Sequence, residues 1–499
     1  MQPDLARLSR DSDNQAYCDV LFPLQVMSKY STRNPWNSRG SGALYASSMP
    51  VPKRGDKMMA TTLLERIRSK RARVGVIGLG YVGLPLCIAA SRAGLSVIGF
   101  DIDDSKTKCL NAGESYIKHI PGELVADLAA SGRFEATVDF SRLADVDAAL
   151  ICVPTPLTKH HEPDLSYVVN TTKAIAPHLR AGQLIVLEST TYPGTTRDVL
   201  KPILESTGLV CGKDFYLAFS PEREDPGNPD FSASRIPKVV GGEGEEASAL
   251  ANALYATFVV RTVPVSSSAT AEAVKLTENI FRSVNIALVN ELKVIYAAMG
   301  IDIWEVIEAA KTKPFGFMPF YPGPGLGGHC IPIDPFYLTW KAKEFELSTR
   351  FIELAGEINI AMPAYVVARL AEALDRRSRK GLNGSRILLL GLAYKKNIDD
   401  LRESPSLKLI SLLEDRGAAV DYADPFIPVI PMTREHADVA GRKAVALTAE
   451  AVAGYDAVLI STDHDAFDYA MLVSSARIIV DSRNACRSRG HDAPNIVAA

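Results

Sequence analysis

The segment GPGLGGHCIPIDP, residues 323–335, places a single thiol among glycines and prolines. Cys330 follows His329 and lies four residues before Asp334, and this composition predicts neither a helix nor a strand. Glycines allow a ligand to approach the backbone closely, and such loops often carry function. A thiol at a helix N-terminus or beside a cation is a nucleophile at neutral pH. Spacing alone leaves two interpretations of Cys330 open, a catalytic nucleophile or a small packed side chain.

Other polar residues lie at positions where chemistry is plausible. In VKLTEN, Lys275 and Asn279 are four residues apart, so they share one face of a helix. In FSPERED, Glu222 follows the apolar strand text FYLAF and is a candidate acid or base. In VPTP, Thr155 ends another strand and offers its hydroxyl and backbone to a ligand. The alternatives are a solvated lysine on an amphipathic helix and a glutamate in a solvated loop.

A glycine motif indicates a dinucleotide site. GLGYVG supplies Gly78, Gly80 and Gly83 between an apolar strand and a helix, and Asp101 ends the next strand. The helix N-terminus would face the pyrophosphate, and Asp101 would accept hydrogen bonds from a ribose hydroxyl. This favours NAD over NADP, although Lys106 could tolerate a 2′-phosphate. The alternative is a glycine-rich turn in an ordinary α/β domain.

A weaker copy of this motif follows near the C-terminus. GLAY comes after the apolar strand text RILLL, but it lacks the third glycine and an acidic residue at the expected distance. We therefore predict a second domain of similar fold that has lost or altered dinucleotide binding.

The elements that position these residues alternate between strand and helix, which predicts parallel, doubly wound sheets. Long amphipathic helical text covers residues 266–310 and about 348–377, between the two α/β regions. TTLLERIRSKR, before the first strand, reads as a short amphipathic helix. The expected organisation is an N-terminal Rossmann-like NAD domain, a helical connector that includes the cysteine loop, and a C-terminal Rossmann-like domain. The predicted boundaries are a flexible extension at 1–70, then 71–265, 266–380 and 381–499.

The overall composition narrows the functional classes. The chain has 499 residues and a net charge of −3, which argues against broad nucleic-acid binding. No uninterrupted apolar run is long enough to cross a bilayer, and the N-terminus lacks an apolar signal core. The seven cysteines are scattered without a CxxC pair, so neither a metal site nor a disulfide framework is expected. These features predict a cytoplasmic protein with free thiols.

The motifs VPTP, ESTTYPGTT, SPEREDPGN, KLTEN, GPGLGGHCIPIDP and DLRESPS occur in one order with the glycine fingerprint. In this the chain resembles the UDP-glucose/GDP-mannose dehydrogenase family over about residues 73–490. The resemblance implies oxidation of the C6 alcohol of a nucleotide sugar to a carboxylate with two NAD⁺. It also implies that the nicotinamide binds the first α/β domain, that the nucleotide of the sugar binds the last, and that the helical connector forms a homodimer or a higher homo-oligomer.

The resemblance also assigns roles to residues of this chain. Cys330 matches the nucleophile that forms a thiohemiacetal and then a thioester. Lys275 and Asn279 match groups that stabilise the developing oxyanion. Asp334 matches an acidic residue that positions water or the lysine, and Glu222 matches an acid/base in thioester hydrolysis.

Further positions are implied to bind cofactor or substrate. Thr155 matches a threonine that orients water, and Arg402 of DLRES matches an arginine near the cofactor. The implied cofactor-binding residues are Gly78, Gly80, Tyr81, Val82, Gly83, Asp101, Lys106, Thr155 and Arg402. The implied substrate-binding residues are Glu222, Arg223, Lys275, Asn279, Arg282, Gly325 and Gly327.

The substrate follows from departures within the family. The chain has GGHC and SPEREDPG where the UDP-glucose enzymes have GGSC and NPEFLxEG, which resembles the branch that acts on UDP-N-acetylhexosamines. The expected substrate is UDP-N-acetylglucosamine, and the product would feed surface polysaccharide synthesis. Its N-acetylmannosamine and N-acetylgalactosamine counterparts and UDP-glucose remain alternatives. Arg223 is expected to contact the sugar, whereas Pro226 replaces a family glutamate and His329 has no assigned role.

Two other classes of function remain open. One is a nucleotide-binding regulator without catalysis, which would have lost part of the set formed by Cys330, Lys275, Asn279 and Asp334. The other is a two-electron alcohol dehydrogenase of the 6-phosphogluconate dehydrogenase type, which shares the domain order and would form one NADH per substrate.

Overall fold

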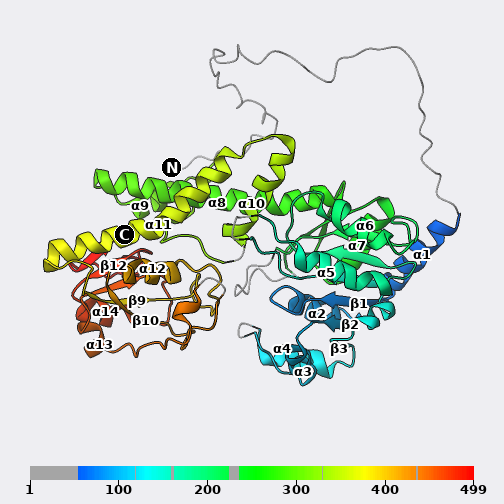
Figure 1. Ribbon diagram of the computed structural model, residues 1–499, viewed down its shortest axis with the longest axis horizontal. Helices are drawn as coiled ribbons and strands as arrows, with labels where there is room; N and C mark the ends of the chain where they lie inside the picture. The colour runs from blue at the N-terminus through cyan, green and yellow to red at the C-terminus, as the bar shows by residue number, and fades with distance from the viewer. Residues whose placement is uncertain (1–53, 118–119, 159–161, 224–234, 329, 434–435) are drawn as a thin grey trace, which may run out of the picture. The chain divides into compact units, whose positions relative to one another are not determined.

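The computed structural model describes residues 54–117, 120–158, 162–223, 235–328, 330–433 and 436–499. Within them lie two sheets and a set of long helices (Figure 1). The predicted fold class, two α/β regions with helices between them in the chain, is confirmed.

The first sheet has the strand order β3-β2-β1-β4-β5-β6-β7-β8. Its strands are β1 (Arg73–Ile77), β2 (Ser96–Phe100), β3 (Phe134–Thr137), β4 (Ala148–Ile151), β5 (Leu184–Leu187), β6 (Tyr216–Phe219), β7 (Lys238–Gly242) and β8 (Thr262–Val265). Neighbouring strands run parallel except for β6 and β7, which pair antiparallel. The order reverses at β1 and β4, and in sheets of this kind ligands bind outside the carboxyl ends of the strands at such a point.

Helices cover both faces of this sheet. They are α1 (Arg54–Arg68), α2 (Gly83–Arg92), α3 (Asp104–Asn111), α4 (Gly122–Ala130), α5 (Ser166–Ile175), α6 (Lys201–Glu205) and α7 (Glu245–Tyr255). Alternate residues of each strand feed two cores, as Val76 and Ile77 of β1 do. Leu63 and Ile67 of α1 are buried in the first of these cores, so the structure places this helix with the α/β unit rather than with the extension predicted for residues 1–70.

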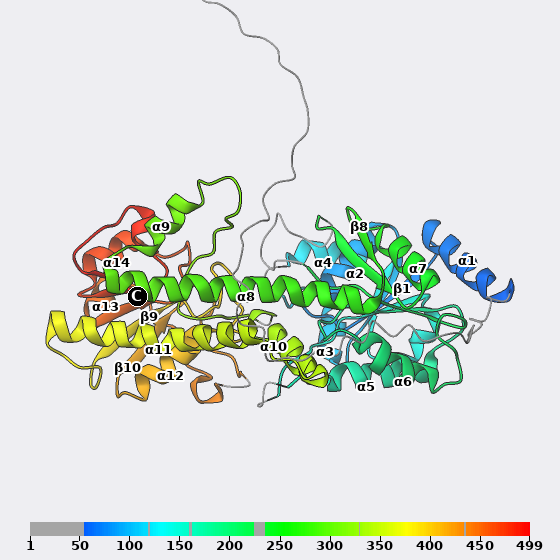
Figure 2. The ribbon, with the colours of Figure 1, turned by 90° about the horizontal axis from the view of Figure 1, so that it is seen from above.

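The central helices are α8 (Ser268–Met299), α9 (Ile303–Ala310), α10 (Cys330–Ala342) and α11 (Arg350–Ser378). The hydroxyl of Ser267 accepts a hydrogen bond from the N–H of Thr270 and caps α8, and Gly300 ends it with a left-handed φ of 73°. Helices α8 and α11 lie side by side over much of their length (Figure 2).

The cysteine segment differs from its prediction, because residues from Cys330 onward are helical. Pro332 is the third residue of α10, where a backbone N–H has no partner within the helix. Pro335 lies inside the helix, and only one hydrogen bond to the first turn is lost there. Pro332 and Pro335 thus lie at the start of a helix, whereas residues 323–328 form neither helix nor strand, as predicted.

The second sheet has the order β10-β9-β11-β12-β13, and all its strands are parallel. The strands are β9 (Arg386–Leu390), β10 (Ala419–Ala423), β11 (Ala457–Ile460), β12 (Ile479–Asp481) and β13 (Ile496–Ala498). Helices α12 (Pro405–Glu414), α13 (Ala449–Ala453) and α14 (Tyr469–Ser475) pack against it.

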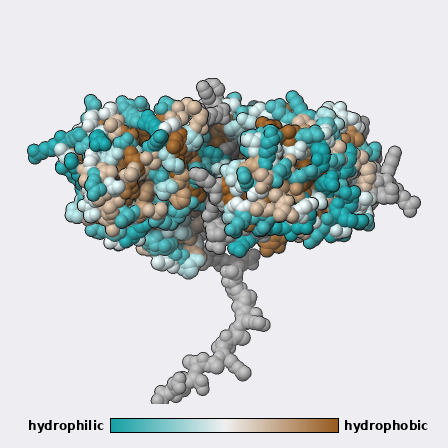
Figure 3. Space-filling model, turned by 90° about the horizontal axis from the view of Figure 1, so that it is seen from below, coloured by the Kyte–Doolittle hydropathy of each residue, from teal (hydrophilic) through white to brown (hydrophobic). Residues whose placement is uncertain are grey.

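On length and composition alone, α11 is the one helix in the described residues that could cross a membrane. Its residues Val366, Leu370 and Leu374, however, are buried in the core of the second sheet, which is typical of a core helix in a globular protein. On the face shown in Figure 3, hydrophobic residues are interrupted by hydrophilic ones.

Candidate active site

The glycine turn after β1 requires residues without a side chain. Gly78 has a φ of 93°, and a Cβ at this position would lie 2.7 Å from the carbonyl oxygen of Cys152. A Cβ on Gly83 would lie 1.9 Å from the carbonyl oxygen of Gly78, so helix α2 can approach the turn only with glycine here. A Cβ on Gly80 would meet no atom within 4 Å. The turn therefore fits a bound pyrophosphate at the N-terminus of α2, with Gly80 as the place of closest approach.

Asp101 orients this turn. One of its carboxylate oxygens accepts a hydrogen bond from the N–H of Leu79 at 2.9 Å, and the other accepts one from the N–H of Asp103 at 3.0 Å. The ammonium of Lys106 lies 3.5 Å from Asp101. A carboxylate has about four acceptor positions, so Asp101 retains capacity for a ribose hydroxyl.

Two further predicted cofactor residues meet over the turn. The guanidinium of Arg402 lies 4.6 Å from the centre of the Tyr81 ring, a cation–π contact. Arg402 is held in place by several hydrogen bonds to Asp400, the shortest at 2.6 Å. Val82, also predicted to bind the cofactor, precedes the first residue of α2.

One face of α8 carries the predicted oxyanion residues. Lys275 and Asn279 are both buried, and Arg282, three residues further on, is exposed. The side-chain amide of Asn279 donates a hydrogen bond to Asp334 on α10 at 2.5 Å. Asp334 lies one helical turn after Cys330, which begins α10. His329 and the side chain of Cys330 lie outside the described part of the structure.

Asp334 is the most perturbed of the predicted site residues for which a pKa shift is resolved. Burial raises its pKa to about 7, although Lys275, the hydrogen bond from Asn279 and Arg282 act in the opposite direction. Its second carboxylate oxygen has no hydrogen-bond partner among the described residues. A buried acceptor of this kind can hold a water molecule or a substrate hydroxyl.

Glu222, which follows the end of β6, lies beside Lys275. The ammonium of Lys275 donates a hydrogen bond to the carbonyl oxygen of Glu222 at 2.5 Å, which ties α8 to this segment. Arg223 is paired with Glu278 at 2.6 Å and donates to the carbonyl of Pro237, also at 2.6 Å. Arg223 therefore anchors the segment to α8 and β7.

Thr155 adds the end of β4 to the site. It is buried, and its carbonyl oxygen accepts a hydrogen bond from the hydroxyl of Tyr337 on α10 at 2.9 Å. Segments after β4 and β6, α8 and the first turns of α10 thus converge, although they are far apart in sequence.

The predicted substrate glycines pack closely against the protein. A Cβ on Gly325 would lie 3.2 Å from Pro405, and one on Gly327 would lie 2.4 Å from the Cβ of Tyr394. The N–H of Gly328 donates to the carbonyl oxygen of Arg402 at 2.9 Å. Close packing explains why these positions are glycine, and their contact with substrate stays a prediction.

Three polar residues beside Glu222 were missed from the sequence. Lys238, at the start of β7, forms ion pairs with Glu188 at 2.5 Å and with Glu222 at 3.3 Å. The hydroxyl of Tyr255 donates to the other oxygen of Glu188. The available signal was a charged residue next to an apolar strand. Glu188 follows the strand in LIVLEST, and Lys238 begins the strand in KVVGG.

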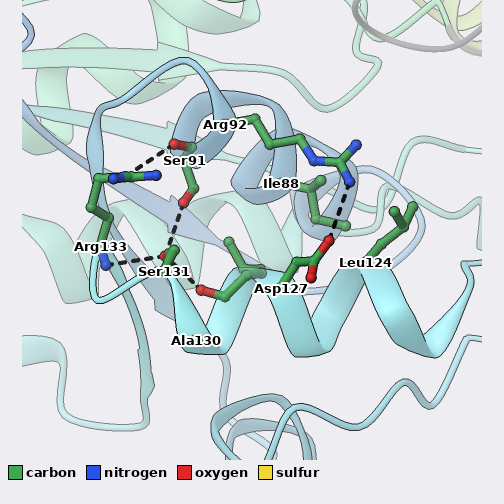
Figure 4. A pocket seen from close by; sticks show the side chains of 9 residues that line it. Ile88, Ser91, Arg92, Leu124, Asp127, Ala130, Ser131 and Arg133 are labelled. Atoms are coloured by element: carbon green, nitrogen blue, oxygen red, sulfur yellow. Dashed lines mark hydrogen bonds and ion pairs between the residues drawn. The ribbon is translucent and has the colours of Figure 1, made fainter.

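A cavity of about 380 Å³ between α2 and α4 holds none of these residues (Figure 4). Its polar contacts are internal, such as Arg92 with Asp127 at 3.9 Å and the Arg133 side chain with the carbonyl oxygen of Ser91 at 3.3 Å. Nothing in this cavity competes with the convergent site.

A dinucleotide-binding turn close to buried acid, amide and lysine groups is the arrangement of an NAD-dependent oxidoreductase. Three stretches of the chain match domains of one family: residues 72–259 its NAD binding domain, 269–361 its central domain and 388–488 its UDP binding domain. The chain belongs to the UDP-glucose/GDP-mannose dehydrogenase family.

Similar proteins differ in the sugar named for them. The chain is 36% identical over 400 residues to a UDP-N-acetyl-D-glucosamine 6-dehydrogenase of Pseudomonas aeruginosa, which covers 80% of this chain and 92% of that protein. It is 35% identical over 422 residues to an NDP-N-acetyl-D-galactosaminuronic acid dehydrogenase of Ralstonia nicotianae, with 82% and 95% covered. The solved structure of a UDP-D-ManNAc dehydrogenase from Pyrococcus horikoshii superposes with a TM-score of 0.77 at 34% identity, over 85% of this chain and 98% of that one.

Proposed function

We propose that this protein oxidises the C6 primary alcohol of a UDP-N-acetylhexosamine, with UDP-N-acetylglucosamine as the preferred substrate, to the corresponding uronic acid. The observation that carries the proposal is the convergence of Lys275, Asn279, Asp334 and Glu222 at the helix that begins with Cys330. Each of these groups suits one step of a four-electron oxidation.

NAD bound at the turn after β1 would supply the hydride acceptor at C6 for both oxidation steps. In the first step the alcohol also loses a proton and becomes an aldehyde. The thiolate of Cys330 adds to the aldehyde carbon to form a thiohemiacetal, and the second oxidation converts this adduct to a thioester. Cys330 is the first residue of α10, and the N-terminus of a helix carries a partial positive charge.

The oxyanion that forms at C6 needs hydrogen-bond donors to stabilise its negative charge. Lys275 supplies an ammonium and Asn279 supplies an amide, and both are already held in place by Glu222 and Asp334. The second oxygen of Asp334 would accept a hydrogen bond from the attacking water and position it, and Thr155 would help to orient this water. Glu222 is the acid/base that completes hydrolysis of the thioester.

The remaining predicted contacts complete the proposal. Arg402, Tyr81 and Lys106 bind the cofactor around the glycine turn, and Arg282 and Arg223 lie near the sugar. The nucleotide of the substrate binds at the carboxyl ends of the strands of the second sheet, as is usual in parallel α/β folds. We place the protein in the cytosol, where surface polysaccharide precursors are made.

A second copy of the chain is the proposed partner. Phe281, Leu288 and Ile295 recur at seven-residue spacing on α8 and are 49%, 48% and 46% exposed. An apolar stripe of this kind on a long helix is suited to a homodimer contact. Light scattering should give the dimer mass, and Leu288→Asp should give the monomer.

The decisive experiment is a panel of UDP-sugars with NAD⁺ and a count of NADH per sugar. We expect two NADH per UDP-N-acetylglucosamine, and slower turnover of the two N-acetyl epimers and UDP-glucose. Fastest turnover of UDP-glucose would contradict the proposed substrate, and one NADH per sugar would indicate a two-electron dehydrogenase. The Cys330→Ser variant should lose acid formation at least about 1,000-fold, and wild-type turnover by it would contradict the mechanism.

A further inference from the structure

Behind Glu222 lies a group of buried polar side chains that the proposed mechanism does not use. Glu188, Lys238 and Tyr255 are each at most 4% exposed, and the side chain of Glu222 is 14% exposed. Burial of charged groups is costly unless they are paired, so a group of this size indicates a specific role.

The strand topology brings the group together. Glu188 directly follows β5, and Glu222 follows β6 after two residues. Because β7 runs antiparallel to β6, its first residue, Lys238, lies at the edge of the sheet where β5 and β6 end. Tyr255, the last residue of α7, covers Glu188 from one face of the sheet.

Lys238 is shared by two carboxylates. Its ammonium lies 2.5 Å from one oxygen of Glu188 and 3.3 Å from one oxygen of Glu222, and it also lies over the ring of Tyr255 at 5.3 Å. Tyr255 donates to the second oxygen of Glu188, and the N–H of Arg223 donates to the second oxygen of Glu222 at 2.6 Å. A pair that only stabilised the sheet would need no contact with Glu222.

Other ionisable groups near Glu222 are few among the described residues. Lys275 of α8 contacts its backbone carbonyl, and Arg223 is neutralised by Glu278. Cys152, after β4, is partly buried near Glu188, Lys238 and Glu222, and desolvation keeps its pKa well above the usual value, so it stays neutral. Lys238 is thus a cation in direct contact with the Glu222 carboxylate, and Glu188 is an anion that competes for it.

We propose that Lys238 and Glu188 form a positioning pair that aims the Glu222 carboxylate and keeps it anionic for hydrolysis of the thioester. The inference rests on the proposed function, in which Glu222 is the acid/base. In this step water adds to the thioester carbon and gives one proton to Glu222. The C–S bond then breaks and releases the carboxylic acid and the Cys330 thiolate.

Two substitutions should move the pH profile of this step in opposite directions. Lys238→Met removes the cation that stabilises the anionic Glu222, so the acidic limb of the profile should move up by about one pH unit. Glu188→Gln removes the competing anion and leaves Lys238 to Glu222 alone, so the same limb should move down. The test measures acid formation by the full-length enzyme from pH 5 to 9 with UDP-N-acetylglucosamine and NAD⁺.

A second readout reports the intermediate directly. The reaction of Lys238→Met is run at the acidic end of the pH range and then quenched with acid. Intact-protein mass spectrometry should then show the thioester on the enzyme. Wild-type enzyme should show much less of this adduct, because it hydrolyses the thioester faster. A role limited to stability would lower the melting temperature without this accumulation.

Glu272→Gln is the matched control. Glu272 is also fully buried and accepts hydrogen bonds from Gly194 and Thr196, but it has no contact with Glu222. Its pH profile should match the wild type. An equal shift of the acidic limb in Glu272→Gln overturns the inference. An unmoved limb in Glu188→Gln also overturns it, and this variant keeps the test valid even if Lys238→Met does not fold. A wild-type enzyme that forms no acid from any UDP-sugar contradicts the proposed function and the inference together, whereas acid formation with unmoved limbs overturns the inference alone.

Discussion

The two α/β units place a glycine, a backbone amide and an aspartate in the same relation at their first turn. In the first unit, Gly78 approaches the carbonyl of Cys152, and Asp101 accepts from the N–H of Leu79. In the second unit, a Cβ on Gly391 would lie 2.4 Å from the carbonyl of Thr462, and Asp424 accepts from the N–H of Leu392 at 2.6 Å.

The aspartates differ in what else they bind. Asp424 also accepts from His464 at 3.0 Å and from the N–H groups of Ala393, Phe426 and Ile427. With five donors the acceptor positions of this carboxylate are filled, so no place remains for a ribose hydroxyl. The same turn is therefore free to serve a cofactor in one unit, as we propose, and serves internal structure in the other.

Four substitutions test this comparison, and the largest effect is expected at the turn of the first unit. Gly83→Ala places a Cβ 1.9 Å from the carbonyl of Gly78, so the turn must open. Affinity for NADH should fall at least about 1,000-fold, whereas UDP should bind the second unit nearly as before. Fluorescence titration with NADH and calorimetry with UDP measure the two affinities.

Gly122→Ala is the control for this change. Gly122 also begins a helix, α4, but a Cβ there would meet no atom within 4 Å. Equal loss of NADH affinity in both variants would show that the close approach of α2 is not the cause.

Asp424→Asn should affect stability but not cofactor binding. It removes the charge that His464 and four backbone N–H groups share in a buried place, and the loss should be about 3 kcal/mol. Urea unfolding measures this change, and NADH affinity should remain within about twofold of wild type. If the affinity for NADH fell together with the stability of Asp424→Asn, a purely structural role of Asp424 would be contradicted.

The pKa of Asp424 predicts how the stabilisation by the Asp424–His464 pair depends on pH. Burial raises the pKa, but the hydrogen bond and charge of His464 and the backbone N–H groups lower it below the usual value. The stabilisation is therefore present above the ordinary aspartate pKa of about 3.9 and is lost as pH falls through the lower folded value. Asp424→Asn should remove this part of the acid sensitivity.

Asp101→Asn should show the reverse pattern with a smaller effect. The variant keeps an acceptor for the N–H of Leu79 but weakens the bond to a ribose hydroxyl, so NADH should bind about tenfold more weakly. The free energy of unfolding should change by less than in Asp424→Asn. A larger loss of stability at Asp101 than at Asp424 would reverse the comparison.

The smallest effect is expected for Lys106→Ala. Its side chain is 36% exposed, its ammonium lies 3.5 Å from Asp101, and exposed ion pairs contribute little. NADH affinity should change less than about threefold, and binding of NADPH should weaken if Lys106 tolerates a 2′-phosphate. Titration with both cofactors measures the ratio.

Much of this could be predicted from local patterns. The glycine turn, the alternating strands and helices, and the shared face of Lys275 and Asn279 each depend on residues close together in sequence. The second turn was predicted in part only, because the acidic residue was judged to be missing. Asp424 does end the second strand, as Asp101 does, but the longer segment between Gly391 and β10 hides it from a rule based on spacing.

The rest needed the tertiary structure. The prolines of residues 323–335 predicted a loop, whereas α10 begins at Cys330 because the first turn of a helix tolerates residues without an N–H. Glu188, Lys238 and Tyr255 come from three elements, and only the antiparallel pairing of β6 and β7 brings Lys238 to Glu222. By itself the sequence determined which residues are candidates for catalysis and which turn is suited to a dinucleotide. Which charges face Glu222 and Asp334, and which aspartate is left able to bind a ligand, depended on strand order and burial, which join residues far apart in the chain.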